Sequence, residues 1–234
     1  MADDTDTDEL GIPVLAKPLS ASGRKRASIT EAAIAEFVQR GYTGASVDSI
    51  ATRAGVSKPT IYSHFGNKQR LFLAVIGGYL RDSYTDLGPR ADGIADAPDL
   101  RTALVDFLGA WVEVVLREDI MTLRRLVIGE VERFPQLGEV WARINIVHDD
   151  ALVRAFTALD QRGTLQVPDP RAAVRQLIAM TIGAAQLIRT FRPAYRFDDG
   201  ELDALVTSGV DVFLSAYAGF VVPAAVVSRR RRAG

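Results

Sequence analysis

The residues best placed for binding chemistry lie in the short segment from Ser57 to Phe65. If this segment is one helix, Ile61 and Phe65 are four residues apart and face inward, which leaves a polar face outside. Eight helical residues span about 12 Å and fit a DNA major groove of about 12 Å width. The segment therefore predicts a helix that contacts base edges. Its outward residues, with the lysine that follows, are Lys58, Pro59, Thr60, Tyr62, Ser63, His64 and Lys68.

These outward residues are expected to divide into two roles. The N-terminal residues of a recognition helix reach base edges while its flanks meet phosphates, so Lys58 and Thr60 are the base-edge candidates. Tyr62, His64 and Lys68 are placed for phosphates, Lys68 because it opens the next helix, where free N–H groups favour an anion. Two alternatives stay open: Tyr62 is also consistent with a half-buried core residue, and His64 with a helix cap.

The residues just before this helix are of the types needed to position it. A second short helix beginning near Ser46 precedes the tripeptide Ala54-Gly55-Val56, and Ala51 is small enough for a point where two helices nearly touch. Gly55 suits a turn with positive φ, Ser57 is a good N-cap and Pro59 fits the first helical turn. A helix-turn-helix is therefore expected over residues 46–65. The alternative is a helical hairpin that only packs.

Charge is distributed unevenly, although the whole chain has a net charge of −1. Residues 24–70 contain eight basic and three acidic residues, whereas residues 71–228 contain 15 and 21. Residues 1–23 contain one basic and five acidic residues, and residues 229–234 contain four arginines. A basic stretch around the expected helix-turn-helix indicates a module that binds a polyanion.

The residue content argues against most enzyme and metal chemistry. The chain has no cysteine, which excludes thiolate zinc sites, iron–sulfur clusters and cysteine nucleophiles. His64 and His148 are the two histidines, so a three-histidine site is impossible. Residues 148–150 point about 100° apart on a helix and cannot converge on one ion. We expect no enzyme activity, no metal and no cofactor.

Apolar residues recur at three- and four-residue intervals from Arg24 onward, which predicts an all-α fold of about nine helices. Ser28 and Glu31 have the spacing of a capping box, so the first helix is expected to begin there and to end at Gly41. The segment from Gly88 to Pro98 is expected to be a loop. The other helices are expected over 46–53, 57–65, 68–85, 99–117, 119–133, 136–162, 170–191 and 200–217.

The two ends of the chain differ from the body in composition. Residues 1–23 are acidic and rich in Pro, Ser and Gly, which predicts a disordered arm rather than a signal peptide. The uncharged stretch 212–227 covers only about 24 Å of a hydrocarbon core of about 30 Å, so a membrane anchor is not expected. Residues 219–234 are interpreted as a flexible tail that carries the cluster Arg229 to Arg232.

Residues 23–83 carry a spaced pattern: Gly41-Tyr42, then Ala54-Gly55-Val56-Ser57-Lys58, then Tyr62-x-His64-Phe65 and Lys68. This pattern resembles the N-terminal domain of the TetR family of transcriptional regulators. Three departures occur: Ala45 replaces the usual threonine, Glu36 stands near an expected apolar site, and Gly66-Asn67 replaces Pro-Ser. Ser46 can still cap the first helix of the motif. YSHFGNK, with RRLVIGEVERFPQLGEVW further on, resembles the AefR-like branch.

The resemblance implies a DNA-binding domain over 24–83 and a helical domain for ligand binding and dimerisation over 84–218. In this family the middle helices enclose a small-molecule pocket and the last two pack against a partner chain. The implied pocket candidates are Phe107, Trp111, Ile128, Val131, Trp141, Ile144 and His148. The implied homodimer interface contains Val174, Leu177, Ile178, Ile182, Ala185 and Ile188. Each of these residues is also consistent with ordinary core packing.

Together these features predict a cytoplasmic DNA-binding regulator, a repressor that binds a palindromic operator as a homodimer and responds to a small apolar or amphipathic effector. An activator, or a low-specificity DNA binder assisted by the arginine tail, is one alternative. A helical small-molecule-binding protein with a vestigial DNA module is another.

Overall fold

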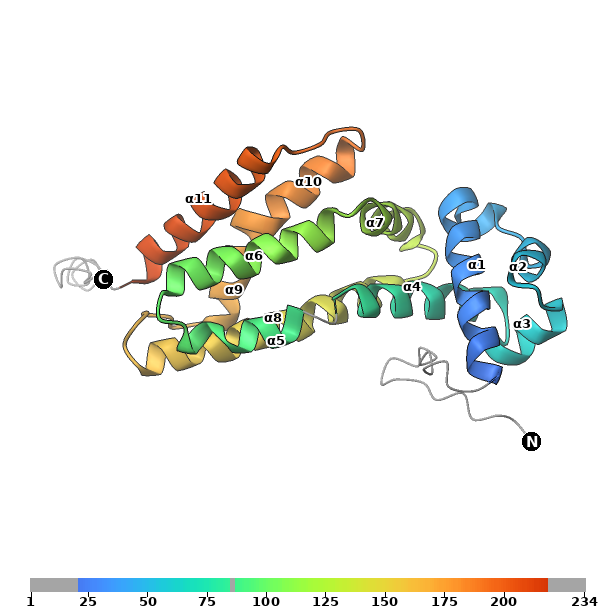
Figure 1. Ribbon diagram of the computed structural model, residues 1–234, viewed down its shortest axis with the longest axis horizontal. Helices are drawn as coiled ribbons and strands as arrows, with labels where there is room; N and C mark the ends of the chain where they lie inside the picture. The colour runs from blue at the N-terminus through green and yellow to red at the C-terminus, as the bar shows by residue number, and fades with distance from the viewer. Residues whose placement is uncertain (1–20, 85–86, 219–234) are drawn as a thin grey trace, which may run out of the picture. The chain divides into compact units, whose positions relative to one another are not determined.

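The computed structural model describes residues 21–84 and 87–218, except the side chains of residues 21, 22, 81, 143–148 and 199. Every regular element within these residues is helical, as the all-α prediction requires (Figure 1). The elements are α1 (Ala21–Gly44), α2 (Val47–Ala54), α3 (Lys58–Phe65), α4 (Lys68–Tyr84), α5 (Leu87–Asp92), the 3₁₀ turn η1 (Ile94–Asp96), α6 (Leu100–Leu116), α7 (Glu118–Glu130), α8 (Gln136–Gln161), α9 (Pro170–Ile178), the π-helical turn η2 (Ala179–Gly183), α10 (Ala184–Phe191) and α11 (Asp199–Tyr217). The expected arm and arginine tail lie outside the described residues, apart from residues 21–23, which belong to α1.

Contacts divide the chain into two compact units. The first contains residues up to 86 together with Val114–Val147, and the second contains Leu87–Glu113 and the residues from His148 onward. The units are therefore not consecutive stretches of sequence, because α6 and α8 contribute residues to both. The domain boundary expected at residue 83, between a DNA-binding domain and a domain for ligand binding and dimerisation, follows the order of the sequence motifs. This assignment of functions stays a prediction.

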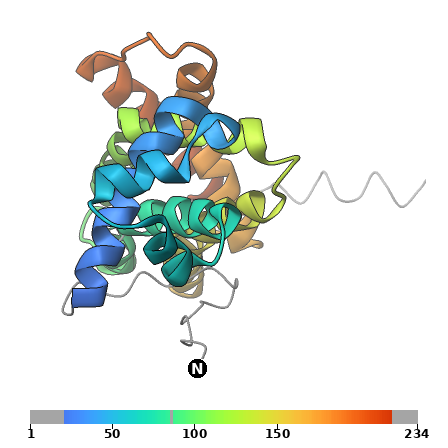
Figure 2. The same cartoon turned by 90° about the vertical axis from the view of Figure 1, so that its right-hand side faces the viewer.

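In the first unit, α1, α2 and α3 pack side by side and α4 lies against α1 and α3 (Figures 1 and 2). Aromatic side chains form the core: the Phe37 ring meets Phe72 edge-on at 4.8 Å, and the Tyr42 ring meets Phe134 at 4.5 Å. Phe37 and Phe72 are fully buried, and truncation of such a ring costs about 3–5 kcal/mol. Phe134, which follows α7, thus packs against α1 and α4 from a distant part of the sequence.

The first helix begins earlier than the capping-box spacing predicted. The chain is already helical at Ala21, and the Ser28 hydroxyl donates to the Lys25 carbonyl at 3.0 Å instead of capping a helix start. The expected interruption at Gly41 is confirmed, because Gly41 takes a φ of 66° that strains a residue with a Cβ. The Ser-x-x-Glu spacing did not mark the helix start, because the hydroxyl of a serine inside a helix can equally well donate to a carbonyl of the preceding turn.

The second unit is built around contacts between helices that are distant in sequence. The rings of Phe156 on α8 and Phe213 on α11 stack with centroids 5.0 Å apart. α11 also approaches η2 closely, since a Cβ at Gly209 would lie 2.4 Å from Cγ2 of Thr181. The π-helical turn interrupts the single helix expected over 170–191 and shifts the helical phase of the residues after it.

The segment expected to be a loop, 88–98, is largely helical. α5 and η1 occupy most of it, and Leu87, Ala91 and Ile94 are buried. These three residues have helical spacing, which places them on one inward face. The loop prediction was wrong because Gly, Pro and Asp also suit short helical turns at their ends.

Candidate DNA-binding interface

Two short helices and a tight turn form the expected helix-turn-helix. Gly55 ends α2 with a φ of 66°, and the Val56 amide donates to the Ala51 carbonyl at 3.0 Å. Ser57 starts α3, and its Oγ accepts from the Thr60 amide at 3.3 Å. The small buried residue, the left-handed turn residue and the N-cap are all confirmed where the sequence predicted them.

α3 has one buried face and one exposed face. Ile61 and Phe65 are 0% and 2% exposed, so they anchor the helix. Tyr62 is 38% exposed on the opposite side, which favours the surface interpretation of this residue over the core one. Of the other predicted contact residues, Lys58, Pro59 and Ser63 are exposed, while Thr60 and His64 are half-buried. The structure thus leaves Lys58, Pro59, Tyr62 and Ser63 accessible on α3 and covers Thr60 and His64 in part.

Lys58 already has an acidic partner in the isolated chain. Its Nζ lies 2.9 Å from Oδ2 of Asp48 on α2, and both side chains are exposed. The hydrogen bond and the charge of Asp48 raise the pKa of Lys58 above its usual value. An ion pair as exposed to solvent as this one contributes little to stability, so DNA can displace it at low cost. The sequence alone did not predict this pairing.

Lys68 is directed toward the protein. Its Nζ donates to the carbonyl of Ala45 at 2.6 Å and lies 4.8 Å from the centre of the Tyr42 ring. Burial, and then the charge of Arg133, lower the pKa of Lys68. Its ammonium therefore fastens the connection between α1 and α2 to the start of α4, and a phosphate contact by Lys68 stays a prediction.

Glu36 is a buried residue that the sequence marked as a departure without assigning a role. It is 1% exposed, and its carboxylate accepts from the Ser46 amide at 3.1 Å and from the Ser49 hydroxyl at 2.9 Å. Burial alone would raise the pKa of Glu36, but these hydrogen bonds, with the charges of Arg40 and Arg53, lower it overall. Glu36 and Ser46 together cap α2, since Ser46 Oγ also accepts from the Ser49 amide. The sequence signal for this role was that Glu36, a charged residue, stands near a helix position expected to be apolar.

Further basic side chains surround the helix-turn-helix. Arg24, Lys25, Arg53 and Arg70 are exposed. The Arg26 guanidinium lies 5.1 Å from the centre of the Phe65 ring, and the Ser28 hydroxyl reaches the Ala54 carbonyl at 3.4 Å. The start of α1 is thereby held beside the turn and α3. The local excess of positive charge predicted these residues as a group but not individually.

The implied pocket residues do not all fall in one unit. Phe107 and Trp111 belong to the second unit, where they are buried and their rings meet edge-on at 5.6 Å. Ile128, Val131 and Trp141 belong to the first unit, in which Ile128 is 51% exposed. The side chains of Ile144 and His148 lie outside the described residues. Of the described candidates, Phe107 lines a cavity.

The implied interface residues lie mostly inside their own unit. Val174, Leu177, Ile182 and Ala185 are 0–2% exposed, and Ile178 and Ile188 are half-buried. An apolar stripe at helical spacing serves a core and an interface equally well, so the sequence could not distinguish the two faces. The outward apolar residues of these helices are Leu187 and Phe191 on α10 and Val212 on α11, which are 59%, 77% and 54% exposed.

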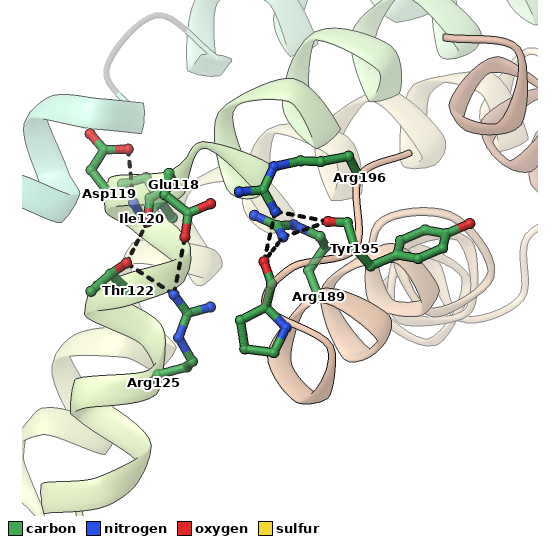
Figure 3. A network of polar contacts seen from close by, with 9 residues as sticks. Glu118, Asp119, Ile120, Thr122, Arg125, Arg189, Tyr195 and Arg196 are labelled. Atoms are coloured by element: carbon green, nitrogen blue, oxygen red, sulfur yellow. Dashed lines mark hydrogen bonds and ion pairs between the residues drawn. The ribbon is translucent and has the colours of Figure 1, made fainter. Parts of the chain in front are cut away.

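Figure 3 draws two polar clusters, one in each unit. In the first, Arg125 Nη2 donates to the Thr122 hydroxyl at 3.0 Å and to the Glu118 carboxylate at 3.3 Å, in the first turns of α7. In the second, the guanidinium groups of Arg189 and Arg196 both donate to the carbonyls of Pro193 and Tyr195. The second cluster holds the connection between α10 and α11 in one conformation.

Within the described part of the chain, no group of three His, Asp or Glu side chains is arranged to hold a metal ion. No helix among the described residues is long and apolar enough to cross a membrane.

Two family models match the chain. Residues 29–75 match the bacterial regulatory proteins of the tetR family, and residues 102–219 match the C-terminal domain of AefR-like transcriptional repressors. A solved structure, a putative TetR-family transcriptional regulator from Mesorhizobium loti, is 30% identical, covers 86% of this chain and 100% of its own, and superposes with a TM-score of 0.79.

The curated relatives include a transcriptional activator and transcriptional repressors. The HTH-type transcriptional activator FasR of Mycolicibacterium smegmatis is 26% identical over 69% of this chain and 71% of its own. The HTH-type transcriptional repressor SCO4008 of Streptomyces coelicolor is 47% identical over 22% of this chain and 27% of its own.

Proposed function

This chain belongs to the TetR family of bacterial transcriptional regulators, and we propose that it is a ligand-responsive repressor that binds a palindromic operator as a homodimer. DNA binding and regulation of transcription follow from the family. The observation that carries the proposal is α3 itself, which Ile61 and Phe65 anchor in the core while Lys58, Tyr62 and Ser63 remain exposed.

We assign base-edge contacts to Lys58 and Thr60, which begin α3 and would enter the major groove first. Tyr62, Ser63 and His64 would meet the phosphates further along the helix, and the exposed Arg24, Lys25, Arg53 and Arg70 would extend the phosphate contacts. Ser46, Ser57 and Pro59 act by fixing the helix starts. Lys68 is a positioning residue in this proposal, because its ammonium is engaged by backbone carbonyls.

The homodimer interface is proposed on the outward face of α10 and α11. Leu187, Phe191 and Val212 are large apolar residues that the folded chain leaves exposed. A two-fold contact through this face would set two recognition helices on half-sites one helical repeat of about 34 Å, or a multiple of it, apart. Sedimentation of Phe191→Glu as a monomer, with wild type as a dimer, is the expected result.

We propose repression because the C-terminal part matches the domain of AefR-like repressors. Activation is the second candidate, because one relative is named as an activator. A ligand bound in the second unit would alter operator affinity with a coupling of about 1–3 kcal/mol. We propose no enzyme activity, because the family that the chain belongs to consists of transcriptional regulators, and we propose a cytoplasmic location, where bacterial DNA is found.

Selection from random duplex DNA at about 150 mM salt tests the proposal, because phosphate-only binding is weak there. An enriched inverted repeat is expected. Thr60→Ala should change the preferred bases, whereas Arg70→Ala should weaken binding to all sequences alike. If wild type enriches no sequence, or enriches one without two-fold symmetry, the dimeric operator reader is refuted.

A further inference from the structure

The second unit contains a cavity of about 400 Å³ that none of the DNA-binding residues lines. Its lining residues come from the segment formed by α5, Gly93 and η1 on one side and from the first half of α6 on the other. Volumes of this size hold small organic ligands. The lining residues are Arg90, Gly93, Ile94, Ala103, Asp106 and Phe107.

The floor of the cavity is apolar and firmly packed. Ile94 and Phe107 are 2% and 3% exposed. The Phe107 ring is held by an edge-on contact with Trp111 on the next turn of α6. A hydrocarbon or aromatic group could rest on this floor without rearranging it.

The rim carries one charge of each sign. Arg90 and Asp106 line the cavity and are exposed. Neither side chain has a hydrogen bond or an ion pair in the described part of the chain, and they are not paired with each other. Each is therefore free to bind a group of the opposite charge.

These two residues differ from the other charged residues between 87 and 106, which all have partners. Two of these partners, Arg154 on α8 and Arg162 immediately after it, connect the α5–η1 segment to the rest of the unit. The pairs are Asp92 with Arg154 at 2.7 Å, Asp96 with Arg162 at 2.8 Å, Asp99 with Thr102 at 2.7 Å and Arg101 with Asp211 at 2.7 Å.

We propose that this cavity is the effector site and that it binds a small amphipathic zwitterion. Its carboxylate binds the Arg90 guanidinium, its ammonium binds the Asp106 carboxylate, and its apolar part rests on Ile94 and Phe107. A ligand with one charge satisfies only half of the rim, so both charges are needed for tight binding. The effector role rests on the ligand response proposed above, whereas binding itself does not.

Calorimetry with the full-length protein tests the site with three probes: L-phenylalanine, 3-phenylpropanoate and 2-phenylethylamine. L-phenylalanine has both charges and each other probe has one, on a similar apolar group. We expect L-phenylalanine to bind about tenfold or more tightly than either, because each lacks one charge-assisted bond. Arg90→Gln and Asp106→Asn should each weaken the binding of L-phenylalanine by about tenfold, because each removes one charge-assisted bond.

Two further variants separate binding in the cavity from indirect effects. Ala103→Phe fills the cavity, keeps both charges and should abolish binding while the helical circular dichroism is retained. Glu113→Gln removes an exposed acidic residue from the same helix and should leave binding unchanged. No binding of L-phenylalanine at millimolar concentration, or equal binding by wild type and Ala103→Phe, overturns the site. If 3-phenylpropanoate binds with the same affinity as L-phenylalanine, the preference for a zwitterion is refuted.

Operator binding, measured separately, distinguishes this inference from the proposed function. L-phenylalanine should change the operator affinity of wild type and leave that of Ala103→Phe unaltered. A protein that binds its operator but none of the probes refutes the cavity assignment alone. A protein that binds L-phenylalanine but selects no DNA sequence refutes the regulator and the effector role, and leaves only a binding site.

Discussion

Glu36 in the first unit is buried and Asp149 in the second is half-buried, and their pKa values move in opposite directions. The Glu36 carboxylate faces two hydrogen-bond donors, which lower its pKa in spite of burial. Asp149 has a buried Oδ1 without a hydrogen-bond partner, and burial followed by the charge of Asp150 raises its pKa to about 6. Burial therefore does not decide the direction of the shift; the donors and charges that face the carboxylate decide it.

The difference has a consequence for each unit. Glu36 stabilises the start of α2 in its charged form and so helps to position the helix-turn-helix. Asp149 is ionised at neutral pH at a cost to the second unit, which the nearby Arg171 and Arg175 reduce only in part. Four substitutions at Glu36, Asp149 and Ser49 test this comparison, in order of decreasing expected effect, and a fifth, Asp48→Asn, tests an exposed carboxylate.

Glu36→Leu should have the largest effect. It leaves the Ser46 amide and the Ser49 hydroxyl without their acceptor, which should lower the free energy of unfolding by about 2–3 kcal/mol. Chemical denaturation gives the stability, and operator affinity of the folded fraction shows whether α2 is still positioned. If the Leu variant is as stable as wild type, the apolar residue serves this site equally well and the capping role is wrong.

Glu36→Gln is the matched control, and pH separates charge from shape. Because the folded pKa of Glu36 is below its ordinary value of 4.5, the stabilisation by the charge is present above that value and is lost as pH falls through the folded pKa. The stability difference between wild type and Glu36→Gln should therefore shrink below pH 4.5. A difference that is constant with pH would contradict the charge argument.

Asp149→Asn should stabilise the protein by about 1–2 kcal/mol at pH 7. The folded pKa of Asp149 is about 6 against an ordinary 3.8, so wild type loses stability as pH rises through this window. The Asn variant should lack that loss, and the two proteins should be equally stable below pH 3.8. Unfolding curves that remain parallel from pH 3.5 to 7 would show that Asp149 does not titrate as described.

Ser49→Ala should cost about 1 kcal/mol, because it removes one of the two donors to Glu36 and leaves the other. Ser63→Ala is a suitable control, since the exposed Ser63 hydroxyl bonds only to the Thr60 carbonyl of its own helix. In a double-mutant cycle, Ser49→Ala should have almost no effect once Glu36 is Leu. Additive effects of the two substitutions would mean that they do not act through one bond.

Asp48→Asn should have the smallest effect on stability, because the pair with Lys58 is exposed to solvent. The same change should raise operator affinity by about threefold, since Lys58 is released and a negative charge near the phosphates is removed. Fluorescence anisotropy with labelled operator measures the change, with the exposed Asp82→Asn as the control. Unaltered affinity would remove Lys58 from the base-edge contacts.

Local features were predictable from the sequence, while features that depend on a distant residue were not. Ser57, Gly55 and Ala51 act through the backbone within five residues, and all three behave as predicted. Ser28 failed, since its hydroxyl satisfies a helix interior as readily as a helix start. The pairing of Lys58 and the direction of Lys68 escaped prediction, because their partners lie 10 and 23 residues away.

The sequence by itself determined that the chain is helical, where its helix-turn-helix lies and which face of α3 carries polar side chains, because a 3.6-residue period and local caps are sufficient for each. Only the tertiary structure decided that Glu36 caps α2, that residues 88–98 form a wall of a cavity, and that the apolar stripe of α9 and α10 is turned inward. An apolar or acidic residue has the same type whether it faces a core, a partner or water. What it faces depends on helices that are brought together from remote parts of the chain.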